Sequence, residues 1–245
     1  MPRIDFTSHR LYVDAALGAG AQIALDRAQA NYLLNVLRLK EGAILLVFNG
    51  RDGEWRAAIQ PDGRKSALLR VREQVRVQPD PGGLHYLFAP LKHARLDYMA
   101  QKAVEMGASV LRPVLTRRTQ AARINLERMR ANVIEAAEQC GILHLAQVEP
   151  EVTLDALLET WPQQRWLVFC DEDVDVADPL AALQAVRGTP DIGVLIGPEG
   201  GFDEAERRAI LALPHVVRLS LGPRVLRADT AAVAALALVQ AVAGF

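Results

Sequence analysis

A glycine-rich segment in the last third of the chain has the composition of a ligand-binding turn. The sequence IGPEGG at residues 196–201 ends an apolar run and precedes Asp203 and Glu206, a D-x-x-E capping box that predicts a helix. Glycine lets the backbone approach a ligand closely, although a plain strand-to-helix turn is the alternative. The segment is not a P-loop, since no Gly-Lys-Ser/Thr follows. Its spacing, with Pro198 inside it, also excludes the dinucleotide fingerprint G-x-G-x-x-G.

A second segment brings charged side chains to a similar place. The sequence LSLGPRVLRADTA at residues 219–231 leaves another apolar run through a Gly-Pro bend and enters a helix. After the bend its side chains include, in order, Arg224, Val225, Leu226, Arg227, Asp229 and Thr230. An ordinary α/β protein does not need two arginines and an acid in one turn, and we expect Val225 and Leu226 to point inward. Both segments are expected at the carboxyl ends of parallel strands, where open α/β sheets usually bind ligands.

The elements that would position these segments change character along the chain. The first third shows short runs typical of strands, glycines after Asn49 and Asp52 that indicate hairpin turns, and one helix beginning at Asp26. A small barrel is expected, with strands at residues 10–13, 22–25, 43–48, 54–59 and 67–71. Farther along, strands and helices alternate, which predicts a parallel sheet covered by helices on both faces. Its strands are expected at residues 84–89, 110–115, 166–170, 192–196 and 216–221, and its helices at 94–106, 125–140, 178–188, 203–213 and from 228 onward.

A proline- and glycine-rich stretch separates the two patterns. The sequence PDPGG at residues 79–83 is typical of a linker. We therefore expect a barrel domain at residues 1–76, a linker at 77–83 and an α/β domain at 84–245.

The composition excludes several classes of protein and conceals an uneven charge. The 245 residues are 51% hydrophobic, which suits a sizeable buried core and excludes a disordered chain. The formal net charge of -1 is not typical of a nucleic-acid-binding protein. However, residues 1–78 hold 12 basic and 8 acidic residues, a net +4, whereas residues 79–245 hold 16 and 21, a net -5. The distribution of charge along the chain is therefore more informative about a nucleic-acid partner than the net charge.

Cysteine usage and the termini favour a reducing, cytoplasmic compartment. Cys140 and Cys170 form no CxxC pair, are too few for a disulfide scaffold, and are expected as small core residues. Residues 1–10 contain no apolar signal-peptide core, and no stretch is long and apolar enough to span a bilayer. The acidic run DEDVD at residues 171–175 lacks the EF-hand pattern, and no two histidines have ligand spacing. We expect a solvated loop there and no metal.

The two segments together carry a resemblance to a known family. IGPEGGF followed by LSLGPRVLRADTAA resembles the RsmE family of SPOUT-superfamily RNA methyltransferases, which methylates N3 of a uridine in small-subunit (16S) ribosomal RNA. The resemblance extends over the whole chain. Residues 9–13, 35–40 and 47–50 are similar to the PUA-like barrel of that family, and residues 96–107 and 135–140 are similar to the first helices of its catalytic domain.

The resemblance implies a fold, a cofactor and an assembly. The fold is a C-terminal SPOUT-type α/β domain with a parallel sheet and a deep trefoil knot, preceded by a small PUA-like β-barrel. The cofactor is S-adenosyl-L-methionine, bound within the knot, and the assembly is a homodimer whose active site uses both protomers. The implied partner is ribosomal RNA, with no membrane and no metal.

Residue roles carry over by position. One wall of the cofactor site would consist of Gly197, Pro198, Glu199, Gly200 and Gly201. The other wall would consist of Ser220, Leu221, Gly222, Val225 and Leu226. The strand end at residues 169–170 is a candidate third edge. The sequence departs from the family pattern in two places. Residues 142–146 are ILHLA where the family has an arginine, and His144 is the candidate to replace that arginine. Asp229-Thr230 stands in place of the Glu-Thr pair of the family.

A catalytic hypothesis follows from the chemistry of uridine. N3 carries a proton and is a poor nucleophile until that proton is lost or shared, so positioning, a base or a cationic stabiliser would accelerate transfer. The hypothesis is that Arg227 or Arg224 stabilises negative charge on the uracil carbonyl, while Asp229 orients an arginine or accepts the proton. The alternative is that Asp229 caps the last helix and Arg224 pairs with an acidic neighbour.

Basic residues indicate where RNA would bind. Residues 112–130 contain six arginines and one acid, Glu127, within the acidic part of the chain. We expect a phosphate-binding strip that includes Arg112, Arg117, Arg118 and Arg123 from this segment, with Arg10, Arg38 and Lys40 from the barrel. Reversing the charges of Arg117 and Arg118 should then weaken RNA binding and leave cofactor affinity intact. A solvated face is the alternative.

Two other functions remain open at this point. The chain would be either a SPOUT methyltransferase acting on another RNA position, such as a ribose 2′-hydroxyl, or a non-catalytic RNA-binding assembly factor. The intact glycine-rich segment argues against the second, since a pure binder has no need of it.

Overall fold

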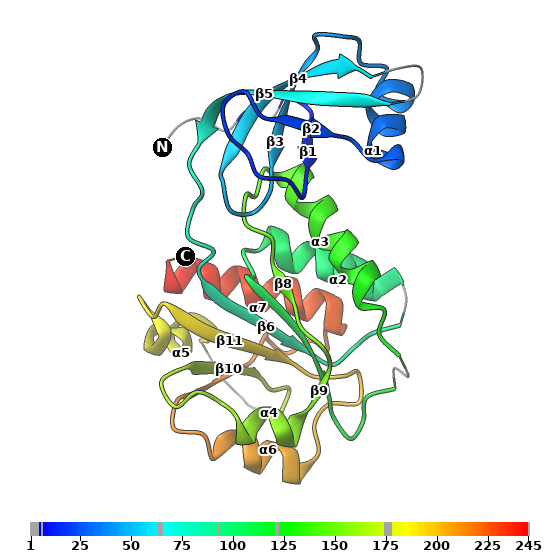
Figure 1. Ribbon diagram of the computed structural model, residues 1–245. Helices are drawn as coiled ribbons and strands as arrows, with labels where there is room; N and C mark the ends of the chain where they lie inside the picture. The colour runs from blue at the N-terminus through cyan, green and yellow to red at the C-terminus, as the bar shows by residue number, and fades with distance from the viewer. Residues whose placement is uncertain are drawn as a thin grey trace. The chain divides into compact units, whose positions relative to one another are not determined.

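The chain folds into two compact units. The computed structural model describes residues 5, 7–62, 66–92, 94–120, 123–173 and 178–244. The first unit contains Met1–Asp80 and Ala137–Leu145, and the second contains Pro81–Ala136 and Ala146–Phe245 (Figure 1). The limits 1–76 and 84–245 given above for the two domains stay a prediction.

The first unit is built on a curled five-stranded sheet, as the strand-like runs predict. The strand order is β1 (Arg10–Tyr12), β3 (Ile44–Phe48), β4 (Glu54–Pro61), β5 (Ala67–Arg76) and β2 (Gln22–Ala24). Strands β1 and β3 run parallel and the other neighbours antiparallel. Gly50 and Gly53, in the turn between β3 and β4, have φ of +83° and +78°, which confirms the reading of Asn-Gly and Asp-Gly as turn signals.

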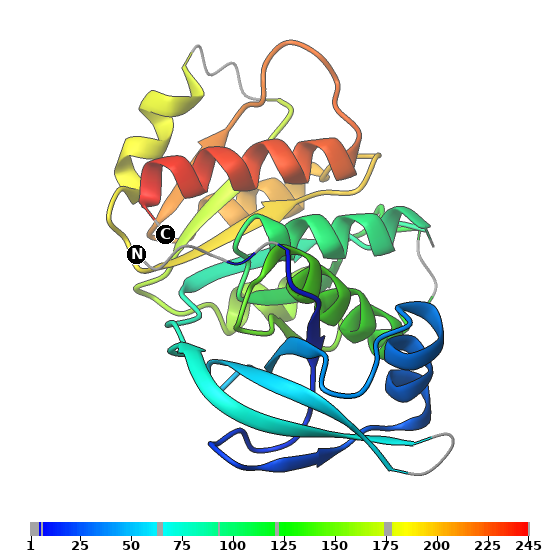
Figure 2. The same ribbon diagram turned by 90° about the horizontal axis from the view of Figure 1, so that it is seen from above.

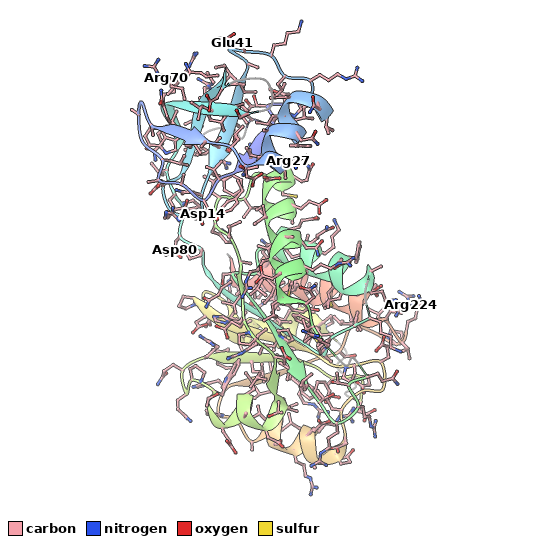
Figure 3. All side chains as sticks on the ribbon, turned by 45° about the vertical axis from the view of Figure 1, so that its right-hand side comes forward. Asp14, Arg27, Glu41, Arg70, Asp80 and Arg224 are labelled. Atoms are coloured by element: carbon pink, nitrogen blue, oxygen red, sulfur yellow. The ribbon has the colours of Figure 1, made fainter. Side chains whose placement is uncertain are left out.

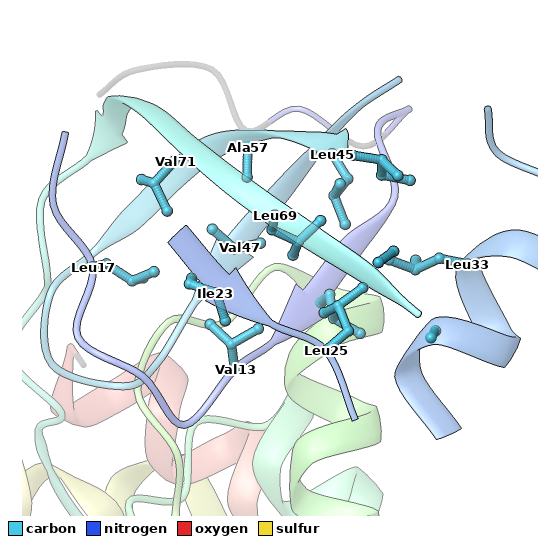
Figure 4. Close-up of a cluster of buried hydrophobic side chains, with 14 residues drawn as sticks. Val13, Leu17, Ile23, Leu25, Leu33, Leu45, Val47, Ala57, Leu69 and Val71 are labelled. Atoms are coloured by element: carbon cyan, nitrogen blue, oxygen red, sulfur yellow. The ribbon is translucent and has the colours of Figure 1, made fainter. Parts of the chain in front are cut away.

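One helical segment closes this unit against its core. α1 (Arg27–Asn31) begins at Asp26, whose carboxylate accepts from the Gln29 N–H in a capping box. It continues as a π-helix, η1 (Tyr32–Val36). Leu33 of η1 is 1% exposed and joins the aliphatic cluster drawn in Figure 4. That cluster also includes Val13, Ile23, Leu45, Val47, Leu69 and Val71.

A buried carboxylate also stabilises the first unit. Glu54 is 1% exposed, and its oxygens accept from Arg10 Nε at 2.6 Å and from Arg76 Nε at 2.7 Å. Arg10 is itself 8% exposed and also donates to the carbonyl of Asp5. The expectation that Arg10 binds RNA is therefore wrong, because its guanidinium is enclosed by the protein and committed to Glu54.

Replacing Arg76 should make the first unit sensitive to acid. Burial would raise the pKa of Glu54, but hydrogen bonds from Arg76 and Arg10 outweigh burial and hold that pKa below its usual value. A lowered carboxyl pKa contributes stability above the unfolded value of about 4.3, and this contribution is lost as the pH falls through the folded pKa. Arg76→Gln should lower the free energy of unfolding by about 1.5–3 kcal/mol at neutral pH and move acid unfolding to higher pH. Urea denaturation at several pH values measures both effects.

A matched control uses an exposed pair on the same sheet. Arg56 and Glu73 pair at 2.6 Å with both side chains half exposed or more. Arg56→Gln should change stability by less than about 1 kcal/mol. If the two substitutions lower the free energy of unfolding equally, the buried pair of Glu54 and Arg76 stabilises the unit no more than an exposed pair does.

The second unit is a seven-stranded sheet, and every pairing in it is parallel, as the alternation predicts. The strand order is β12 (Val216–Leu219), β10 (Trp166–Cys170), β11 (Asp191–Ile196), β6 (Gly83–Phe88), β7 (Val110–Leu115) and β8 (Gln147–Val148), with β9 (Val152–Thr153) on the far half of β7. The sequence did not indicate β8, β9 or α4 (Leu154–Glu159). Two-residue strands and a six-residue helix are too short to show a clear period.

Helices cover both faces of this sheet. On one face, α4 and α6 (Glu204–Leu211) pack on alternate strand residues, including Leu87, Leu167 and Leu195. On the other face lie α2 (Ala94–Glu105) and α7 (Ala228–Ala243), as Figures 1 and 2 show. α3 (Leu126–Cys140), α5 (Pro179–Ala182) and the 3-10 turn η2 (Leu183–Val186) complete the helices of the described chain. The trefoil knot stays a prediction.

Two expectations about single residues are wrong. Cys140 is exposed rather than a core residue, because α3 ends there and the buried side of its last turn is formed by Ala136 and Ala137. Asp171 is 2% exposed, so the start of the DEDVD run is not a solvated loop. Residues 174–177 of that region lie outside the described residues.

In the part of the chain that is described, no helix could cross a membrane and no acidic, histidine or cysteine cluster could hold a metal ion.

Candidate active site at the carboxyl edge of the sheet

Three segments that are distant in sequence emerge at one edge of the second unit. β10 lies between β12 and β11, with Cys170 opposite Leu219 and Phe169 opposite Leu195. Because all three strands are parallel, the segments that follow them start side by side. The prediction that the two singled-out segments leave the carboxyl ends of parallel strands is confirmed.

The glycine-rich segment forms a tight turn whose backbone is closely approached. Gly201 has φ of +67°, and its N–H donates to the carbonyl of Pro198 at 2.9 Å. A Cβ on Gly197 would lie 2.5 Å from the ring of Phe202, and one on Gly201 would collide with the Glu172 carboxylate. Side chains are therefore excluded at both positions. The helix that follows has the predicted capping box, with Asp203 and Glu206 each bonding the other's backbone N–H.

The middle of this turn is more open. Pro198 is buried, whereas Glu199 and Gly200 are exposed. Glu199 lies 3.4 Å from the guanidinium of Arg95 in α2. The turn can thus offer backbone groups to a ligand while the capping box of α6 fixes its far end.

The segment after β12 is largely open, in contrast to the expected inward direction of its apolar side chains. Val225 is 100% exposed and Leu226 is half-buried. The expectation that Val225 points inward is wrong for the single chain. Gly222, with φ of +99°, and Pro223 bend the backbone, and none of the described residues covers Val225 beyond that bend. Ser220 and Leu221, closer to the sheet, are half-buried.

The candidate catalytic side chains stand at the entry to α7. Arg224 and Arg227 are exposed and form no ion pair with any residue that the structure describes; Figure 3 shows Arg224 at the surface. Arg227 is the N-cap of α7 through its backbone, whose carbonyl accepts from Ala231 N–H at 2.8 Å. Asp229 lies in the first turn, where its carboxylate accepts from Thr230 N–H at 2.8 Å. The alternative in which Arg224 pairs with an acidic neighbour is therefore not observed among the described residues.

A buried tyrosine of the second unit has a hydroxyl without a partner in the described chain. Tyr86 of β6 is fully buried, stacks on Phe88, and its hydroxyl has no hydrogen-bond partner among the described residues. Burial raises the pKa of Tyr86 well above its usual value, and the charges of Cys170 and Asp229 add to the effect.

A buried ion-pair cluster joins the three segments, and the sequence did not reveal it. The Asp171 carboxylate, 0% exposed, follows β10 directly. Arg218 of β12 donates to it from Nη2 at 2.6 Å and from Nε at 3.0 Å, and Arg207 of α6 places Nε 3.3 Å from its other oxygen. Arg207 also pairs with Glu172 at 3.0 Å and with Asp173. One carboxylate therefore ties the end of β10 to β12 and to the helix after the glycine turn.

The turn after β7 holds the glycine segment from its other side. Arg118 Nη1 donates to the carbonyl of Gly200 at 2.6 Å. Arg117 donates from its backbone N–H to Glu206 at 2.8 Å and from its guanidinium to Asp203 at 2.7 Å. The backbone N–H of Glu206 and the Arg117 guanidinium lower the pKa of Asp203. Reversing both arginines should therefore disturb the glycine turn as well as any RNA contact, which revises the expectation stated above.

The other basic candidates divide into paired and unpaired side chains. Arg112 lies on the α4 face, 3.0 Å from Glu149, and lines a cavity of ≈ 170 Å³ with His85 and Arg165. It is not part of an exposed strip. Arg128 and Arg130 pair with Asp97 and Glu127. The side chains of Arg38, Lys40 and Arg123 are exposed and make no ion pair within the described chain.

His144 does not offer a surface contact. Its Nε2 is buried without a hydrogen-bond partner, and burial lowers its pKa below the ordinary value. A neutral, half-buried imidazole is a poor replacement for an arginine that would contact phosphate.

Family comparisons agree with this geometry over nearly the whole chain. An RNA methyltransferase domain family matches residues 78–240, and an RNA methyltransferase PUA domain family matches residues 25–72. The ribosomal RNA small subunit methyltransferase E of Rickettsia conorii is 30% identical over 95% of both chains. That of Synechocystis sp. is 31% identical over 96% of this chain and 78% of its own.

Solved structures are similar over the same extent. A methyltransferase from Legionella pneumophila, solved with the cofactor SAM, has 29% identity and a TM-score of 0.83, covering 96% of this chain and 97% of its own. The ribosomal RNA small subunit methyltransferase E of Neisseria gonorrhoeae, bound to S-adenosyl methionine, has 25% identity and a TM-score of 0.84 over the same shares. The parallel sheet, its carboxyl-edge segments and the PUA unit thus define an RNA methyltransferase. The chain belongs to the family of ribosomal RNA small subunit methyltransferase E.

Proposed function

We propose that the protein transfers a methyl group from S-adenosyl-L-methionine to N3 of a uridine in small-subunit (16S) ribosomal RNA. The proposal rests on one observation: the glycine turn and the segment 220–227 both leave the sheet beside the end of β10. The names of the similar proteins support the reaction class and the RNA, and two of the similar structures hold the cofactor. A ribosomal RNA substrate supports a cytoplasmic enzyme.

The carboxyl edge fits this cofactor. Gly197 and Gly201 let the backbone turn tightly against Phe202 and Glu172, and the backbone of Gly200, in the middle of the turn, is exposed. An adenosine is well held by backbone groups and apolar side chains. One wall would be the turn Gly197–Gly201, the other Ser220, Leu221 and Gly222 with Leu226, and the third edge the end of β10. The bound cofactor supplies a sulfonium methyl group.

The residues of this chain would then act on the uracil. Arg227 and Arg224 are exposed and lack carboxylate partners among the described residues, so their charge is available to a developing uracil anion. Asp229 stands two residues beyond Arg227, close enough along the chain to orient a guanidinium or to accept the N3 proton. Orientation of the base toward the methyl donor would contribute further rate.

The proposal includes a homodimer and a knotted active-site domain. Val225 is fully exposed in the single chain, and a second protomer packed on the segment 220–227 would cover it. Val225 would then complete the site from within the dimer. For RNA, the proposed contacts are Arg38, Lys40 and Arg123, with Arg117 and Arg118 acting on both RNA and the glycine turn.

Cofactor binding gives the first test of the proposed function. Isothermal titration of the purified protein with S-adenosyl-L-methionine should show saturable binding at one site per chain. A well-folded protein that binds none would be a non-catalytic RNA-binding factor instead.

Gly201→Ala should weaken that binding. The residue's φ of +67° costs an L-amino acid about 1–2 kcal/mol, and the new methyl would collide with Glu172. To relieve the collision, either the turn or the Glu172 carboxylate, which pairs with Arg207, must move. We therefore expect about a tenfold loss of affinity for S-adenosyl-L-methionine in the same titration.

Gly188→Ala is the matched control for backbone strain. Its φ is +69°, almost the same, and nothing lies within 4 Å of the added Cβ. It should lose similar stability and keep its affinity. If both variants bind the cofactor as the wild type does, the glycine turn is not a wall of the site.

A further inference from the structure

The first unit carries an exposed surface that neither its core nor the proposed active site uses. It lies on α1, on η1 and just after them. We call it the helical patch; its members are Asn31, Tyr32, Asn35, Val36, Arg38 and Lys40, and every one of them is exposed. They combine an aromatic ring, an apolar side chain, two amides and two cations.

The apolar members face away from the core. Leu33 points into the aliphatic cluster (Figure 4), whereas Val36 is 60% and Tyr32 37% exposed. The Leu37 N–H donates to the carbonyl of Tyr32 at 2.9 Å, which is the bonding of a π-helix. Residues four apart in such a turn lie on one face. Tyr32 and Val36 thus present one continuous apolar surface to the surroundings.

The charges of the patch have one sign. Three basic residues and no acidic residue lie between Asp26 and Glu41. The carboxylate of Asp26 is engaged in capping, where it accepts from Gln29 N–H at 2.8 Å. Arg38 and Lys40 form no ion pair in the described structure. A polyanion fits such a surface better than a second protein with an apolar face.

Backbone strain marks the same place. Arg38 has φ of +56°, and among the described residues every other positive φ belongs to a glycine. Glycine or asparagine would end the helical segment at lower cost. Strained residues of this kind cluster at ligand-binding sites, where the side chain has a use.

We propose that the helical patch is a stacking platform for an unpaired base of the RNA substrate. The base would stack on Tyr32 beside Val36, while Arg38 and Lys40 neutralise the adjoining phosphates. Single-stranded RNA is recognised in this way, by aromatic stacking combined with cationic contacts to the backbone. The proposal rests on the proposed function, since it takes RNA as the substrate.

Salt-dependent binding of a short RNA separates the two kinds of contact. The probe is single-stranded oligoadenylate of about 12 nucleotides, within the usual range of site sizes. Tyr32→Ala should weaken binding by about 5- to 50-fold, because stacking is lost, and leave the slope of log K against log salt unchanged. Tyr32→Phe should bind within about twofold of the wild type. Arg38→Asn, which tolerates the positive φ, should weaken binding and reduce the slope by about 0.7.

Tyr98→Ala is the matched control. Tyr98 is 48% exposed on α2, so its removal is a comparable loss of aromatic surface, and it should leave RNA affinity unchanged. Wild-type RNA affinity of folded Tyr32→Ala would overturn the platform. If Tyr32→Ala also changes the oligomeric mass of the protein in solution while RNA binding is unchanged, the patch binds a protein partner instead. Methylation of 16S RNA by the wild type is measured in parallel. Its absence would refute the proposed function alone, because oligoadenylate affinity tests the platform separately. Its presence with unaffected RNA binding by Tyr32→Ala would refute the platform alone.

Discussion

Arg227→Ala should lower the single-turnover rate of methyl transfer by about 100- to 1000-fold, the usual cost of removing one preorganised charge stabiliser. The side chain of Arg227 is exposed and unpaired in the described chain, and its backbone, not its guanidinium, caps α7. The substitution therefore leaves the fold and the cofactor walls in place. Rapid-quench measurement with labelled S-adenosyl-L-methionine and saturating RNA reports the chemical step.

Cofactor affinity and a neighbouring arginine supply the controls. Calorimetry should show unchanged affinity for S-adenosyl-L-methionine in Arg227→Ala, so that the loss lies in the chemistry. Arg224→Ala tests the other arginine of the same segment, and the larger loss identifies the residue nearer to the uracil. If Arg227→Ala and Arg224→Ala each transfer methyl at the wild-type rate while folded, neither guanidinium stabilises the anion.

Asp171→Asn should lower the free energy of unfolding by about 1.5–3 kcal/mol, because Arg207 and Arg218 lose the buried carboxylate that they share. The substitution keeps the volume of the side chain and removes only its charge. Since Asp171 joins the end of β10 to β12 and α6, affinity for S-adenosyl-L-methionine should fall as well. Urea denaturation and calorimetry measure the two effects.

Asp191→Asn is the control for an aspartate at a strand end. Asp191 pairs with Arg165 at 2.7 Å, but its side chain is 42% exposed. Its loss should cost less than about 1 kcal/mol. The milder variant Arg218→Met, at a position 36% exposed, keeps the test usable if Asp171→Asn does not fold. Equal small effects at Asp171 and Asp191 would contradict a structural role for the buried cluster.

Much of this arrangement was readable from local patterns. Apolar runs at residues 192–196 and 216–221 predicted two parallel strands and placed both segments at one edge, because side-chain period and turn residues act over a few neighbours. The capping residues Asp26 and Asp203 were readable for the same reason. The fold family and the cofactor were predicted from the resemblance of two motifs to a known family, and the composition alone would not have revealed them.

The errors share a physical origin in long-range pairing. Arg10 looked like an RNA contact, yet it is buried against Glu54, which lies on another strand. Asp171 looked solvated, although Arg207 and Arg218 reach it from positions far along the chain. Charge counts within a segment do not reveal such partners. Val225 was expected inside because it is apolar, but burial requires a covering element, and the described part of the chain provides none.

The modified atom is the central claim, and mass mapping of RNA tests it most directly. 16S ribosomal RNA from a strain lacking this gene is incubated with the purified protein and S-adenosyl-L-methionine, digested to nucleosides and to fragments, and analysed by mass spectrometry. One N3-methyluridine should form at a single position, and none without the protein. A ribose 2′-O-methyl group, a methyl group on another base, or no methylation at all would contradict the account.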